Sequence, residues 1–144
     1  MNTLTQKFAQ GLLVFSTVAY LGWGAWAAFG HEQLFSLLAI QPENASGLYE
    51  LIGSYGGINI LLGAFCALAL YRQEFSIPVF LAIGFNMAGY GFGRALALLQ
   101  GIYPDTWLIV IMVVEFILAD VAWFVAWKLH RQQQQPVNHQ AQLA

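Results

Sequence analysis

Four long apolar runs dominate this chain and limit what it can fold into. A helix needs about 20 mostly apolar residues to cross the hydrocarbon core of a bilayer. The runs cover approximately residues 8–30, 48–71, 77–100 and 106–128. A segment inside a bilayer must satisfy its own backbone hydrogen bonds, which a helix does. The sequence therefore predicts an all-α polytopic membrane protein with four transmembrane helices.

The composition supports the membrane class. Of the 144 residues, 59% are hydrophobic and only 8% are charged, whereas soluble domains carry about 25% charged residues. The chain has five Lys and Arg and a formal net charge of −2. Because nucleic-acid binding needs a basic patch, we expect no nucleic-acid partner, and we expect the lipid bilayer to surround the protein.

The connections between the runs predict how the helices are arranged. Residues 72–76 and 101–105 are short connections, and short connections make consecutive helices antiparallel neighbours. We therefore expect an antiparallel four-helix bundle over residues 1–130. The segment LFSLLAI, residues 34–40, is too short to span and is expected on the outer surface or as a cap on the bundle. Residues 131–144 are polar and Gln-rich, and we expect a disordered cytoplasmic tail.

The basic residues at the ends of the runs predict the orientation. Lys7, Arg72, Lys128 and Arg131 all flank ends on one side of the predicted bundle, and the loops on the other side contain no Lys or Arg. Cytoplasmic loops of membrane proteins carry an excess of these residues. Both termini are therefore predicted to be cytoplasmic.

The charged residues inside the runs need a partner, because a buried charge in a membrane is costly. A helix rises about 1.5 Å per residue, which puts Arg94 close to the level of Glu50 and somewhat nearer the outer surface than Glu115. Arg94 can therefore pair with either carboxylate, and the two alternatives stay open. Asp120 lies deeper, and the sequence leaves its role open.

Polar residues of the second and third runs form stripes along their helices. Asn86, Tyr90 and Arg94 lie on one face of the third helix, and Tyr55 and Asn59 share a face of the second. The candidate ligand-binding site or buried polar network comprises Glu50, Tyr55, Asn59, Asn86, Tyr90, Arg94 and Glu115. Such a network can also line a cavity open to the outer leaflet, where an anionic headgroup, a quinone or another small amphiphile would bind.

Glycines also line these two helices, and small residues allow membrane helices to approach closely. We therefore expect tight contact between the second and third helices. The glycines concerned are Gly53, Gly56, Gly57, Gly63, Gly84, Gly89, Gly91 and Gly93.

The sequence leaves an enzymatic function open, with Glu115 as a lone general acid, but favours a protein that is not an enzyme. It contains no catalytic Ser/His set and no metal-ligand spacing. Glu115 and Asp120 are five residues apart, about 140° around a helix, so they cannot both face one small site. We expect no catalytic residue, no bound metal and no cofactor.

Two segments carry a resemblance to a known family. The segment ELIGSYGGINILLG, residues 50–63, has a Glu before Tyr-Gly-Gly, and GFGRALALLQGIYPDTW, residues 91–107, has Gly-Arg followed by Gly-x-x-Pro. The chain resembles the bacterial membrane family known as domain of unknown function 4345. Members often carry a basic residue shortly after the Glu, whereas this chain has Ile52 and Gly53 there, which leaves Arg94 as the cation within the bundle.

The resemblance implies a small inner-membrane protein and brings no established activity. Our main hypothesis is that the protein binds a small amphiphile or lipid in a polar pocket near the outer leaflet. The alternative is a structural or accessory membrane subunit whose buried charges only fix helix packing. A homo-oligomer or another membrane-protein partner remains open.

Overall fold

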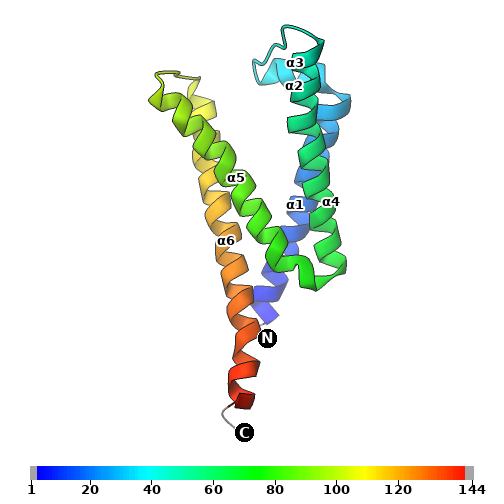
Figure 1. Cartoon of the computed structure of the whole chain (residues 1–144), viewed down its shortest axis with the longest axis vertical. Coiled ribbons are helices and arrows are strands. Elements are labelled where there is room, and N and C mark those ends of the chain that lie inside the picture. The colour runs from blue at the N-terminus through cyan, green and yellow to red at the C-terminus, as the bar shows by residue number, and fades with distance from the viewer. Residues whose placement is uncertain (1–2, 142–144) are drawn as a thin grey trace. The chain divides into compact units, whose positions relative to one another are not determined.

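The computed structural model describes residues 3–141, with side chains over residues 4–134. Every regular element in this range is a helix (Figure 1), which confirms the predicted all-α class. The helical stretches long and apolar enough to cross a membrane are Leu4–Phe29, Ala45–Tyr71, Gln73–Leu99 and Thr106–Gln134. Four such stretches agree with the predicted polytopic membrane class. The chain is divided into two compact units.

One unit consists of residues Gln10–Gln73. It contains most of α1, and its elements are α1 (Thr3–Phe29), α2 (His31–Leu37), α3 (Ala45–Leu51), η1 (Ile52–Gly57) and α4 (Ile58–Tyr71). Asn44 caps α3, because its side chain accepts a hydrogen bond of 2.9 Å from the backbone N–H of Gly47. The elements α3, η1 and α4 form one continuous helix, in which η1 is a π-helical turn.

Glycines bring α1 and the α3–η1–α4 helix into close contact (Figure 1). A Cβ atom added to Gly24 would lie 2.7 Å from the backbone nitrogen of Ile60, and one added to Gly63 would lie 2.8 Å from that of Leu21. Such distances are too short for any side chain. The backbones of the two helices therefore approach as closely as they do because these positions are glycine.

A small core lies at the end of this unit that contains α2. Leu34 and Phe35 of α2 are buried together with Ala27 of α1. The ring of Phe35 packs against that of Tyr55 with 6.0 Å between centroids. The first part of the apolar segment that is too short to span, residues 34–37, thus belongs to a helix that packs onto α1 and η1.

The other unit consists of residues Met1–Ala9 and Glu74–Ala144. Its main elements are α5 (Ser76–Leu99) and α6 (Thr106–Ala141), which lie side by side as an antiparallel pair after the short 3-10 turn η2 (Gln73–Phe75) (Figure 1). The connection begins with Gly101, whose φ of 82° is left-handed. The N–H groups of Gly101 and Ile102 donate to the carbonyls of Leu98 and Ala97, both at 3.0 Å. This is the glycine-terminated cap that commonly ends helices.

Glycines of α5 pack against aromatic residues of α6. A Cβ atom at Gly84 would overlap the Trp123 ring, and one at Gly91 would lie 3.0 Å from the Phe116 ring. The sequence predicts tight contact between the second and third helices. Within the units, Gly56 and Gly63 of the second helix lie close to α1, and Gly84 and Gly91 of the third lie close to α6. Contact between the second and third helices stays a prediction, because the two helices belong to different units.

Helix α6 continues beyond the predicted end of the fourth span as far as Ala141. The sequence predicts a disordered tail over residues 131–144, and residues 142–144 of it lie outside the described residues. Glutamine has good helix propensity, and Gln134 Nε2 lies 2.9 Å from Nε2 of His130, one turn earlier. These local effects favour helix in a polar segment that lacks apolar periodicity.

Candidate functional site

Arg94 and Glu115 form an ion pair that joins α5 to α6. The Nη1 atom of Arg94 is paired with Oε1 of Glu115, and the two side chains are 32% and 11% exposed. A charge pair is strongest where water is excluded, and each partner lowers the cost of burying the other. The sequence offers Glu50 and Glu115 as partners of Arg94, and the structure shows the pair with Glu115.

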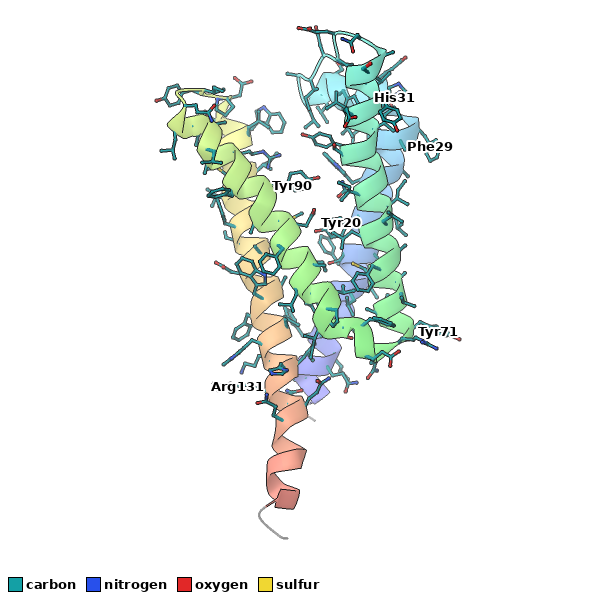
Figure 2. All side chains as sticks on the ribbon, in the orientation of Figure 1. Tyr20, Phe29, His31, Tyr71, Tyr90 and Arg131 are labelled. Atoms are coloured by element: carbon teal, nitrogen blue, oxygen red, sulfur yellow. The ribbon has the colours of Figure 1, made fainter. Side chains whose placement is uncertain are left out.

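Tyr90 supports the same guanidinium from one helical turn earlier on α5. The Cζ atom of Arg94 lies 6.0 Å from the centroid of the Tyr90 ring, which is within the range of a cation–π interaction. Figure 2 shows Tyr90 on α5. Asn86 is half-buried one further turn along the same helix. The structure thus brings Tyr90, Arg94 and Glu115 together as one polar group.

The carboxylate of Glu115 uses only part of its capacity to accept hydrogen bonds. Its Oε2 atom is buried and accepts no hydrogen bond from the described part of the chain. Its Oε1 atom faces Arg94. Within the described part of the chain, the carboxylate of Glu115 is paired with the guanidinium of Arg94. The two residues together carry no net charge.

A pocket of about 140 Å³ lies beside Arg94, where the end of α5 meets the first turns of α6. Arg94 is the charged member of its lining, and the other members are apolar. The residues that line it are Arg94, Ala97, Leu98, Ile102, Pro104, Leu108, Ile109 and Met112. The pocket combines one concentrated source of hydrogen-bond donors with an apolar wall, as ligand pockets commonly do.

The apolar residues of this pocket were not among the predicted site residues, although Ala97 follows Arg94 by three positions and so lies near its face of the helix. The turn around Pro104 is the sequence signal that could have found the others. A tight connection forces the first turns of one helix against the last turns of the other. Leu108 and Met112 must then face the end of α5 where Arg94 lies.

The remaining predicted site residues lie in the other unit, Gln10–Gln73. Glu50 is exposed on α3. Asn59 is 3% exposed, and its Nδ2 atom donates a hydrogen bond of 2.8 Å to the backbone oxygen of Tyr55. This bond lies at the end of η1, where the π-helical turn changes the helical spacing. The grouping of these three residues with Arg94 in one site stays a prediction.

The comparisons with known proteins give one match. The model of a family described as domain of unknown function (DUF4345) matches residues 8–126, which confirms the resemblance seen in the sequence. The matched range contains Arg94, Glu115 and every residue that lines the pocket. No curated protein and no solved structure matches the chain.

Proposed function

The chain belongs to the family described as domain of unknown function 4345, and from the geometry around Arg94 we propose that it binds a small amphiphile or lipid. The observation that carries this proposal is the pocket of about 140 Å³ in which Arg94 is set among apolar residues. An engineered cavity of about 150 Å³ holds a molecule of benzene. The pocket therefore suits a small apolar group attached to a polar end that meets Arg94.

The proposal includes a place for the protein in the cell. We propose that the four spans pack as an antiparallel bundle in a bacterial inner membrane, with both termini cytoplasmic and the pocket near the outer leaflet. The ends of the helices support this orientation. The Cζ atom of Arg131 lies 4.3 Å from the centroid of the Trp127 ring, and Figure 2 shows Arg131 on α6. Paired aromatic and basic side chains are typical of the membrane interface.

A second function is favoured by the ion pair itself. Arg94 and Glu115 join two helices directly, and buried charges of this kind can serve only to fix how helices pack. In this interpretation the protein is a structural or accessory membrane subunit, and the pocket has no ligand. The two functions differ in whether the pocket must be open.

The experiment therefore fills the pocket and leaves the ion pair in place. The Ala97→Leu variant adds three carbon atoms to a residue that lines the pocket, and Ala95→Leu makes the same change on the same helix outside the lining. Each protein is purified in a mild detergent and analysed by native mass spectrometry. We expect a small amphiphile to be retained by the unmodified protein and by Ala95→Leu, and to be lost from Ala97→Leu.

The alternative outcome is equally clear. If the three proteins retain the same molecules in the same amounts, or none retains a small molecule, the pocket is not a binding site. The structural role then becomes the better explanation of Arg94 and Glu115. Size-exclusion chromatography of each variant controls for loss of the fold.

A further inference from the structure

We infer that the pocket takes an uncharged amphiphile whose polar end accepts hydrogen bonds, and that Glu115 is the residue that excludes anions. The ligand class is a small apolar group that carries an amide, ketone or ester carbonyl. This inference rests on the proposed function, since it requires that the pocket binds a ligand. It goes further by fixing the charge of that ligand and the residue that selects it.

The first step is the charge of the site. A lone arginine in an apolar pocket would attract an anion, but the positive charge of Arg94 is already balanced by Glu115. An anion that reached Arg94 would lie close to the Glu115 carboxylate, in surroundings where like charges repel strongly. It would bind only by separating a pair whose acidic partner is 11% exposed. The pair therefore disfavours carboxylate and phosphate ligands.

The second step is what Arg94 can still offer. A guanidinium carries five N–H donors in a planar fork, and the described ion pair engages Arg94 through Nη1. Arg94 also lines the pocket and is 32% exposed. A neutral carbonyl oxygen can accept a hydrogen bond from the exposed part of this group while Glu115 stays in place. Binding a neutral acceptor thus leaves the charge balance of the site unchanged.

The third step concerns the other residues that line the pocket. Leu98, Ile109 and Met112 line the pocket together with the apolar connection, and no acidic or basic residue other than Arg94 appears in that lining. A second charge on the ligand would therefore be buried without a partner, at a large cost. The apolar lining of the pocket and the ion pair therefore both favour an uncharged ligand.

The test compares two probes of nearly the same shape and different charge. The probes are 4-fluorophenylacetamide, which is neutral, and 4-fluorophenylacetate, which is an anion at pH 7.5. Their binding to the protein in phosphatidylcholine nanodiscs is measured by fluorine NMR, and empty nanodiscs give the background for partition into lipid. We expect the unmodified protein to bind the amide more tightly than the acid.

The Glu115→Gln variant should reverse this preference. It leaves the positive charge of Arg94 without its counterion, so we expect the ratio of acid affinity to amide affinity to rise about tenfold or more. Asp120→Asn is the matched control, because it removes the same charge from an exposed position of the same helix outside the lining of the pocket. It should leave the ratio at the value of the unmodified protein.

Each result decides between distinct conclusions. If the unmodified protein binds the acid as tightly as the amide or more tightly, the inference is wrong while the proposed pocket survives. If Glu115→Gln folds and its ratio does not change, Glu115 is not the residue that excludes anions. If Glu115→Gln fails to fold, the comparison of the two probes on the unmodified protein still decides the ligand class. If neither probe binds the unmodified protein, both the inference and the proposed function lose their support.

Discussion

The carboxylate of Glu115 on α6 is paired with the guanidinium of Arg94 on α5, and this ion pair lies directly beside the pocket that Arg94 lines. The two partners are not buried equally, since the side chain of Glu115 is 11% exposed and that of Arg94 is 32% exposed. A long arginine side chain can also move its charge toward a membrane interface, whereas a shorter glutamate cannot. The loss in the free energy of unfolding when the ion pair is broken therefore depends on which of the two residues is retained.

We predict that Arg94→Met destabilises the protein more than Glu115→Gln does. The first change leaves a buried carboxylate without its cation, and we expect a loss of about 2 kcal/mol or more in the free energy of unfolding. The second leaves an arginine that can reach polar surroundings, so its cost should be smaller. Thermal unfolding followed by tryptophan fluorescence in nanodiscs measures both. The exchange Arg94→Glu with Glu115→Arg should recover part of the loss, and equal stability of all these variants would contradict the prediction.

We also predict opposite effects for two glycines that lie two residues apart on α1, Gly22 and Gly24. A Cβ atom at Gly24 would lie 2.7 Å from the backbone nitrogen of Ile60, whereas one at Gly22 would meet no atom within 4 Å. Gly24→Ala forces two backbones apart, which should cost about 1–3 kcal/mol. Gly22→Ala should be neutral or stabilising, because alanine is the better helix former by about 1 kcal/mol. The same unfolding measurement applies, and similar values for the two variants would show that α1 and α4 do not pack as described.

The short helix α2 provides a further matched pair. Leu34 is 0% exposed and Leu37 is 61% exposed, although the two leucines are three residues apart. We predict that Leu34→Ala lowers the free energy of unfolding by about 2–5 kcal/mol, because it opens a cavity in the core formed with Ala27 and Phe35. Leu37→Ala should change it little. A Leu34→Ala variant as stable as the control would mean that α2 does not pack on α1 and η1.

The spans could be predicted from the sequence because their length is a property of each run alone. The predicted span 77–100 corresponds to Gln73–Leu99, and the predicted span 106–128 corresponds to Thr106–Gln134. Both helices extend beyond the apolar runs, because backbone hydrogen bonds can continue into the interface and into water, which hydropathy does not detect. Helix existence is therefore predictable, whereas the polar ends of the helices are not.

The partner of Arg94 could not be predicted, because a single sequence gives depth along a helix but not the direction that each helix faces. Glu50 and Glu115 both lie within reach by depth, and only the packing of α5 on α6 brings Glu115 to Arg94. The contact between Arg94 and Tyr90 was easier to predict, since two residues four positions apart on one helix are neighbours. The π-helical turn at Ile52–Gly57 has no comparable local signal in the sequence.

The orientation in the membrane is the last prediction, and the single cysteine of the chain makes it simple to test. Cys66 is buried, and Cys66→Ala gives a background without thiols. Glu43→Cys and Asp105→Cys then place a thiol at exposed positions in the two connections that contain no Lys or Arg. We expect both to react with a membrane-impermeant maleimide added to intact spheroplasts, because basic residues stay on the cytoplasmic side.

Gln73→Cys and Gln133→Cys are the matched controls on the opposite side. Both positions are exposed. Gln73 directly follows Arg72, and Gln133 lies two positions after Arg131. They should react only after the membrane is permeabilised. Arg94 lies about 8 Å from the end of α5 by the rise of a helix, so the pocket is on the same side of the membrane as that end. The reverse labelling pattern would therefore put the pocket on the cytoplasmic side, and its ligand would have to come from the inner leaflet.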